Sequence, residues 1–250
     1  MENKFQKACF ILLIFLSVGS FLKARAEWTF DLETGLVWSG YNTIQIPRST
    51  GTRFSLSKDL EARSSYFFRL RIGSQIKPRH HISLFIAPLS LDASGKVNKL
   101  IRFEGEEFAA ETPLAATYRF NSYRLTYRYD LINREKWRVG LGFTAKIRDA
   151  AISLEGGSQR AEKTNVGFVP LIHFRVEWLF SQKLGLLLEG DALAAKQGRA
   201  EDLLLALQAQ LNKSIQIKAG YRIIEGGANV EEVYNFAFLN FFVIGAIFKF

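Results

Sequence analysis

The sequence predicts an all-β fold, a closed antiparallel transmembrane barrel of about ten strands. Ten segments of the 250-residue chain alternate apolar and polar residues with a period of two, the pattern of a strand with one face in lipid. After residue 26 no run of 18 apolar residues occurs, so no membrane-spanning helix is expected, and a chain that spans without helices must close into a barrel. Short turns alternate with longer connections, as in such barrels. Eight or twelve strands remain open, because one hairpin could be lost or another could lie within 40–64 or 97–103.

The first 26 residues have the features of a secretory signal peptide. Two lysines precede an apolar run at 10–22, and the small-x-small sequence ARA at 24–26 offers a cleavage site. We therefore expect cleavage near Ala26 and a single barrel domain at 27–250. The one cysteine, Cys9, lies in the leader, so the mature chain has no thiol for disulfides, metal binding or catalysis.

The charge of the chain is positive but dispersed. The formal net charge is +9, and removal of the leader lowers it to +6. Lys and Arg occupy alternate positions within apolar strands and are not clustered on a helix or tail, which argues against nucleic acid as a partner. We interpret them as charges of the barrel interior and of the rims, the rim charges facing outer-membrane lipid and lipopolysaccharide.

The first five predicted strands each place apolar residues on one face. Their expected spans are 27–39, 65–76, 81–91, 115–129 and 137–148. The first turns Asp31 and Glu33 inward, and the fourth ends in Tyr127 and Tyr129, which suits an interfacial aromatic girdle. Segments 77–80 and 131–136 are expected to be short turns, the first because Pro78 cannot join a ladder. Segments 40–64 and 92–113 are expected to be outer loops.

The last five strands follow the same pattern. Their expected spans are 167–180, 184–195, 203–211, 215–223 and 234–250. Short turns are expected at 181–183 and 212–214. Outer loops are expected at 155–165, 196–202 and 225–232, with glycine pairs in the first and last. Asn240 falls on the apolar face of the final strand, which indicates a bulge or an interfacial position there.

The final strand carries the clearest resemblance. Counting back from Phe250 in steps of two gives Phe248, Ala246, Ile244 and Phe242 on one face, and the chain ends on an aromatic residue. This strand resembles the C-terminal strand of bacterial outer-membrane β-barrels as a class. The resemblance implies location in the outer membrane and recognition of the strand ending in Phe250 by the barrel-assembly machinery.

The predicted interior is rich in arginine and carries acids on neighbouring strands. The candidates for pore-lining residues are Arg69, Arg71, Arg124, Arg128, Lys146, Arg148, Arg175, Glu177, Glu189, Asp191 and Arg222. One interpretation is a plug of ion-paired side chains, because a buried charge must be paired and small barrels are filled by their own side chains. The other is a narrow porin-like channel for small anionic solutes, since rings of Arg and Lys select anions.

A barrel enzyme acting on envelope lipid or peptide is an alternative, and histidine would be its usual base. The segment His81-Ile82-Ser83 resembles the His-x-Ser pair of the lipid A 3-O-deacylase barrels, but it follows a turn expected on the periplasmic side. His173 lies mid-strand, where a hydrogen-bonded structural role is favoured. Omptin-like proteases use acidic pairs with a histidine at the outer rim, and no outer-rim histidine is found. We therefore assign no catalytic residue.

A third hypothesis is a binding or adhesion barrel that acts through its outer loops. Two clusters of glycine and charged residues, 198–202 and 225–227, should lie side by side because adjacent strands lead to them. Their spacing matches no metal-binding loop, and no nucleotide-binding motif occurs. We expect no metal and no cofactor.

Overall fold

The structure, a computed structural model, describes residues 27–250. The predicted signal peptide, its cleavage site and Cys9 lie outside the described residues. No helix in the described part is long and apolar enough to cross a membrane. The strands are β1 (Glu27–Gln45), β2 (Phe54–Ser55), β3 (Glu61–Ala62), β4 (Ser65–Lys77), β5 (His80–Ala87), β6 (Ser90–Lys96), β7 (Ile101–Phe103), β8 (Glu106–Phe108), β9 (Pro113–Asn133), β10 (Trp137–Gly156), β11 (Gln159–Leu179), β12 (Leu184–Ala195), β13 (Gly198–Gln210), β14 (Ile215–Asn229) and β15 (Tyr234–Lys249).

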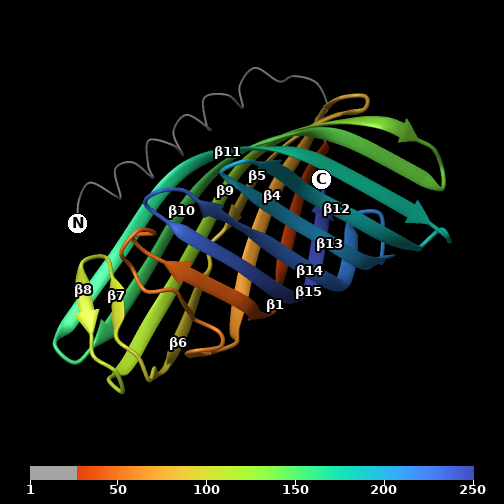
Figure 1. The fold of residues 1–250 in the computed structure, drawn as a ribbon. Helices are drawn as coiled ribbons and strands as arrows, with labels where there is room; N and C mark the ends of the chain where they lie inside the picture. Colours follow the sequence, from red (N-terminus) through yellow and green to blue (C-terminus); the bar gives the residue numbers. More distant parts are fainter. Residues whose placement is uncertain (1–26) are drawn as a thin grey trace, which may run out of the picture.

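The wall of the molecule is a closed antiparallel barrel of ten strands, as predicted (Figure 1). Strands β5 and β6 both pair with β9 and together form one wall strand. The break between them contains Pro88, which has no N–H to give to a ladder. The ring runs β1, β4, β5 with β6, and then β9 to β15 in order.

The ring closes where the first strand meets the last. Strand β1 pairs with β15 from Thr29 opposite Lys249 to Gln45 opposite Tyr234. Past the end of this register, the Trp28 N–H donates to the Phe250 carbonyl at 3.1 Å, and the Phe250 N–H donates to Trp28 at 2.9 Å. The C-terminal aromatic residue therefore helps to close the sheet, so no backbone edge remains at the seam.

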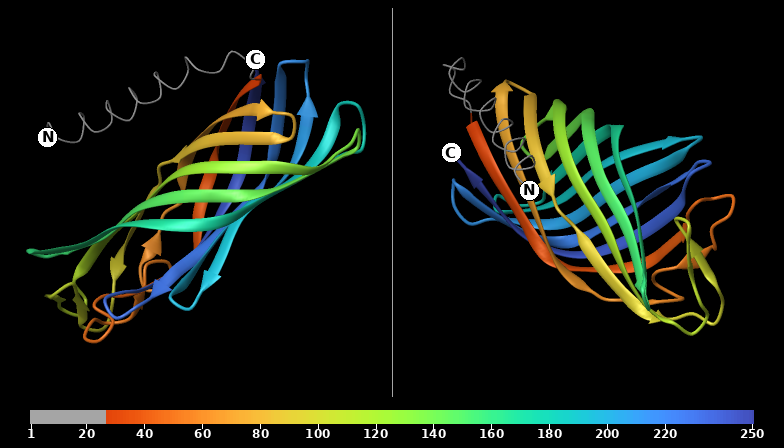
Figure 2. Two further views of the ribbon diagram at one scale, coloured as in Figure 1. Left: turned by 90° about the horizontal axis from the view of Figure 1, so that it is seen from above. Right: turned by 90° about the vertical axis from the view of Figure 1, so that its left-hand side faces the viewer.

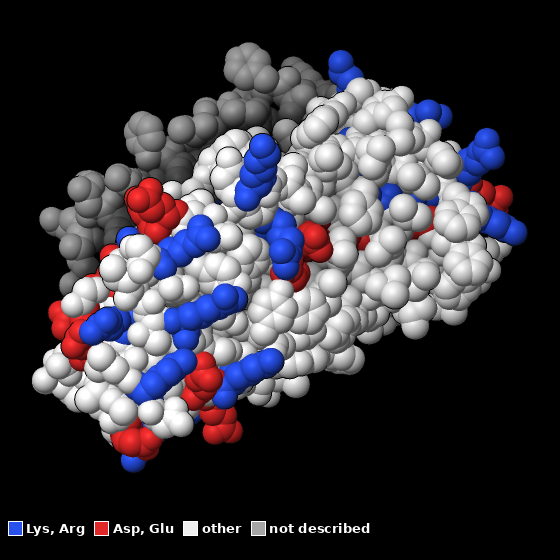
Figure 3. Space-filling view, in the orientation of Figure 1, with Lys and Arg blue, Asp and Glu red and all other residues white. Residues whose placement is uncertain are grey.

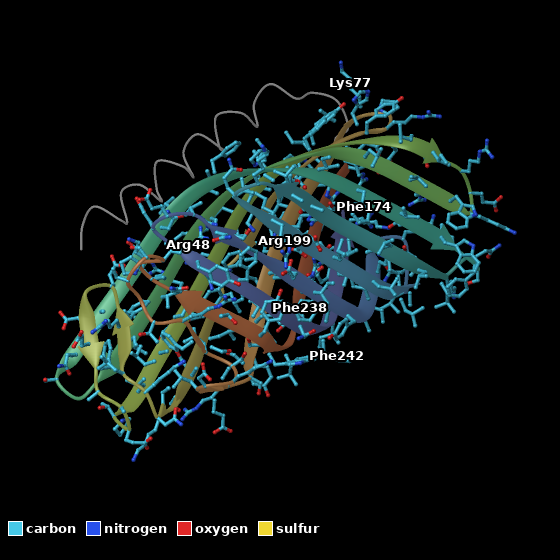
Figure 4. The ribbon with its side chains drawn as sticks, viewed as in Figure 1. Arg48, Lys77, Phe174, Arg199, Phe238 and Phe242 are labelled. Atoms are coloured by element: carbon cyan, nitrogen blue, oxygen red, sulfur yellow. The ribbon has the colours of Figure 1, made fainter. Side chains whose placement is uncertain are left out.

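Apolar and polar side chains alternate across the wall, as the sequence predicts. In β15, Leu239, Phe241 and Val243 are buried inside, whereas Phe242 and Ile244 are exposed outside. Figure 3 shows the result as a broad uncharged band across the visible outer face, and Figure 4 places Phe242 on that face. Behind such a lipid-facing surface, the backbone N–H and C=O groups must form their hydrogen bonds within the sheet.

The two ends of the barrel differ. The end with the short connections, which we call the turn end, carries the predicted turns near 77–80, 131–136, 181–183 and 212–214 and both described termini. At the opposite loop end the wall is uneven: β9, β10 and β11 extend further than the β12–β13 hairpin beside them (Figure 2).

All five predicted outer loops are shorter than predicted, and in 40–64 and 92–113 the change is that β1 extends to Gln45 and β6 to Lys96. Most of 155–165 is strand, because β10 and β11 are joined at 157–158. The range 198–202 opens β13, and 225–229 ends β14. Beyond the apolar belt the outer face becomes polar, so the contrast between the two faces that marks a strand in sequence is lost.

Asn240 lies beside an irregularity of its neighbour strand. The β1–β15 register shifts between Ser39 and Tyr41, so Gly40 is the extra residue of a bulge. The Asn240 side chain is covered by Tyr221, whose hydroxyl donates to Asn240 Oδ1 at 2.6 Å. The polar side chain is therefore satisfied on an otherwise apolar face.

The two long outer connections fold over the loop end. Apolar side chains from both pack with wall residues into a hydrophobic cluster, which we call the cap, and its most deeply buried members include Ile46, Phe54, Ile101, Phe103, Phe108 and Leu154. Strands β7 and β8 form a two-stranded hairpin outside the barrel sheet. The segment 97–103 therefore adds no pair to the wall, and the twelve-strand alternative is wrong.

Candidate functional site

Most of the charged side chains that point inward meet near mid-barrel in two groups of ion pairs, which adjoin where Asp31 lies opposite Arg71 and which together we call the ion-pair layer. It holds six basic and six acidic residues, so its formal charges cancel: Arg69, Arg71, Arg124, Arg175, Lys218, Arg222, Asp31, Glu33, Glu177, Glu189, Asp191 and Asp202. Period-two strands place these side chains on the inner face, and tight register brings different strands into contact.

Asp202 is the hub of the ion-pair layer. Its carboxylate accepts from the guanidinium groups of Arg69 and Arg124 at 2.6 Å each and from Arg222 at 2.5 Å. The side chain is about 3% exposed. Asp202 is not among the predicted inward residues, because the pattern of 196–202 predicts a loop. The available signal was its position two residues before Leu204, on the same inward face of β13.

Glu33 and Asp31 contribute carboxylates to the layer from β1. Arg222 donates to both oxygens of Glu33 at 2.9 Å, and the Lys218 ammonium donates to Asp31 and to Glu33 at 2.7 Å each. These are charge-assisted contacts of the strong kind, made away from water. Asp31, Glu33 and Arg222 were predicted to face inward.

Glu189 and Glu177 complete the layer toward the turn end. Glu189 accepts from Arg71 and from Arg175, and Arg175 also donates to Glu177. Arg138 lies 3.6 Å from Glu177 at the rim. Glu189 therefore pairs with Arg71 and Arg175, whereas Asp191 has other partners.

His173 contacts the ion-pair layer through Asp191. Its Nδ1 lies 3.0 Å from Asp191 Oδ1, and Asp191 also accepts from Arg124 at 2.6 Å and from Thr144 at 2.7 Å. The described partner of this histidine, Asp191, is thus already bound by Arg124 and Thr144 and is not a free nucleophile. The arrangement is that of a hydrogen-bonded structural histidine.

The other two histidines lie at the turn end. His81 Nε2 is 2.8 Å from Asp130 Oδ2, and His80 Nδ1 is 2.8 Å from the Tyr127 hydroxyl. The predicted inward residue Arg128 bonds to Asp130 at 2.9 Å in the same region. Among residues 27–250 no group of three His, Cys, Asp or Glu side chains is arranged to hold a metal ion.

Two cavities lie on opposite sides of the ion-pair layer. The one at the loop end has a volume of about 270 Å³ and touches the layer at Asp191 and Asp202. The one at the turn end has a volume of about 560 Å³ and touches the layer at Arg71 and Arg175. The layer therefore lies between the two spaces.

Three predicted inward cations fall outside the layer: Arg128, which bonds to Asp130, and Lys146 and Arg148. Lys146 and Arg148, which share the inner face of β10, line the loop-end cavity. All of the predicted pore-lining residues thus lie on the inner face of the barrel wall. Only some of them belong to the ion-pair layer. Whether any of these residues lines a conducting pore remains a prediction.

The two glycine-and-charge clusters lie side by side, as predicted. Arg199 donates to Glu225 at 2.6 and 2.7 Å and lies over the Phe236 ring at 4.9 Å, and Tyr41 bonds to Glu225 as well. In Figure 4, Arg199 and Phe238 both lie on the side of the barrel that carries these two clusters. The cluster is a polar and aromatic edge above the apolar belt.

Comparisons with known proteins give the fold. No family model matches the chain, and no curated protein matches it in sequence. The crystal structure of the outer-membrane protease OmpT from Escherichia coli is similar with a TM-score of 0.59 and 8% identity, over 90% of this chain and 97% of that one.

Weaker likenesses extend to other barrels. The transport unit of the autotransporter AIDA-I from Escherichia coli matches with a TM-score of 0.43 and 8% identity, over 96% of this chain and 97% of that one. Ail of Yersinia pestis matches with a TM-score of 0.37 and 8% identity, over 89% and 98%. The closed ten-stranded wall and the likeness to OmpT agree: this chain has the fold of a bacterial outer-membrane β-barrel.

Proposed function

We propose that the protein is an outer-membrane barrel with a sealed lumen, a structural component of the membrane that forms no open solute pore. The apolar belt supports a place in lipid, since exposed apolar patches of this extent are unusual on soluble proteins (Figure 3). Stacked Trp137 and Trp178, with ring centroids 5.8 Å apart, lie on the outer face near the turn end, as expected of an aromatic girdle.

The observation that carries the proposal is the ion-pair layer. Its basic and acidic residues are equal in number, so the arginines there are neutralised and offer no net field to an anion. A selective anion path needs unpaired positive charge along an open route. The cap adds a second obstruction at the loop end.

We also propose two partners of the barrel, anionic lipopolysaccharide and the barrel-assembly machinery. Basic side chains gather over the loop-end half of the visible face (Figure 3), which suits anionic lipopolysaccharide if this end faces the cell exterior. The C-terminal strand is exposed to the barrel-assembly machinery only before closure, because in the barrel both of its edges are paired.

Conductance tests the proposal. The mature chain, refolded and verified by heat-modifiable electrophoresis, is inserted into a planar bilayer under a salt gradient. We expect a folded protein without discrete conductance steps. Anion-selective steps that shrink in Arg175→Ala, a change beside the turn-end cavity, would refute the sealed lumen and favour the narrow-channel hypothesis.

A further inference from the structure

The wall has a notch at the loop end between β11 and the β12–β13 hairpin. Strand β11 pairs with β10 from Gln159 to Trp178 but with β12 only from Ile172 to Leu179. Within the described chain, residues 159–171 therefore have a ladder partner on one side alone. The β12–β13 hairpin ends at 195–198, so no strand of residues 27–250 continues the wall beside this edge (Figure 1).

The loop-end cavity lies behind the notch. Its lining comes mainly from β9, β10 and β11 on one side of the notch and from β13, β14 and β15 on the other. Much of that lining is apolar, including Tyr118, Phe120, Ile152, Leu171 and Ile224. The space is thus a mainly apolar chamber with a side entrance.

Two cations in the chamber have no carboxylate partner. Lys146 is 4% exposed, and no described carboxylate lies within 4.0 Å of its ammonium, which sits 4.7 Å over the Phe120 ring. Arg148 bonds only to the Asn165 side chain, and its Nε is buried without a partner. Each cation of the ion-pair layer has at least one carboxylate, so these two stand apart. A buried cation without a counter-charge is costly, which indicates an anion that the chain does not supply.

The outer side of the notch is apolar. Val166 and Phe168 on β11 are 70% and 65% exposed. Phe168 is paired with Ile147, a member of the lipid-facing belt, whereas Val166 is paired with Asp149, which contacts Arg119. The edge of the apolar belt passes between these two pairs. The notch therefore opens where lipid chains give way to headgroups.

We propose that the notch binds a single-chain anionic amphiphile, with its carboxylate or phosphate against Lys146 and Arg148 and its hydrocarbon chain leaving past Phe168 into the bilayer. The cavity volume of about 270 Å³ lies just below the usual range of small-molecule sites, so it holds the headgroup and the start of one chain. The proposal goes beyond the sealed barrel, since it needs no path through the ion-pair layer.

Binding of dodecanoate to the refolded mature chain in nanodiscs tests the proposal by titration calorimetry, with empty nanodiscs as background. Dodecanol supplies the chain without the charge, and inorganic phosphate supplies an anion without the chain. We expect dodecanoate to bind, and Lys146→Gln to weaken it by about tenfold or more, since a buried charge-assisted contact is lost. Lys146→Arg should restore binding, and Lys183→Gln, in a turn at the far end, should leave it unchanged.

A second variant separates lipid from free anion. Phe168→Ser alters an exposed side chain, so the fold should survive, and it should weaken dodecanoate binding without affecting inorganic phosphate. Dodecanoate binding that is unchanged in Lys146→Gln, or equal binding of dodecanol, would overturn the proposal. Phosphate binding as tight as that of dodecanoate, with no effect of Phe168→Ser, would assign the chamber to a free anion and also overturn it.

Discussion

Replacement of the hub carboxylate, Asp202→Asn, should destabilise the barrel strongly while keeping its shape. The carboxylate contacts Arg69, Arg124 and Arg222 at 2.5 to 2.6 Å. After the substitution each guanidinium keeps one carboxylate, in Glu33 or Asp191. The layer as a whole would carry one uncompensated buried positive charge.

The expected loss is about 3–5 kcal/mol in the free energy of unfolding, the range found when one partner of a buried ion pair is removed. The matched control is Asp149→Asn, which removes the same charge from a half-exposed pair. Asp149 lies 3.3 Å from Arg119, and the two side chains are 30% and 38% exposed. Because water screens this pair, the control should cost about 1 kcal/mol or less.

Urea titration in phosphatidylcholine vesicles measures both variants. The four tryptophans, Trp28, Trp38, Trp137 and Trp178, all lie on the exposed outer face, so their fluorescence reports departure from lipid. If Asp202→Asn unfolds at the same urea concentration as the control, the layer contributes little to stability, and the reasoning from buried charge is refuted.

Three other changes test the wall and its seam. Lys218→Gln removes the partner that Asp31 and Glu33 share at 2.7 Å each, so it should cost about 3 kcal/mol in the same titration; an unchanged midpoint would contradict this. Gly142→Val places a Cβ about 1.9 Å from the Tyr127 carbonyl oxygen, so we expect no heat-modifiable band, and a normal band would show that the β9–β10 approach is wrong. Deletion of Phe250 removes the hydrogen bonds to Trp28 and should lower the yield of protease-resistant barrel in cells, whereas Phe250→Tyr should retain it; equal yields would contradict a role in closure.

Strand number and the facing of side chains could be predicted from particular residues. In β4, Phe68 and Ile72 alternate with Arg69 and Arg71, and the structure places the arginines inside. The same alternation failed at the loop end, where 155–165 is strand although it was predicted to be loop. There the outer face is no longer in lipid, so polar side chains occur on it and the period is hidden.

The alternation in the sequence predicts a barrel of about ten strands with charged residues inside, because lipid imposes a period of two on every strand that crosses it. The partners of those charges follow from the register and closure of the folded ring. Arg69 meets Asp202 across 133 residues of sequence, and the contact depends on closure of the ring. The notch also appears only there, since it results from the unequal heights of β11 and the β12–β13 hairpin. Register and closure decide which cations have a carboxylate partner and which have none. No local sequence pattern contains this information.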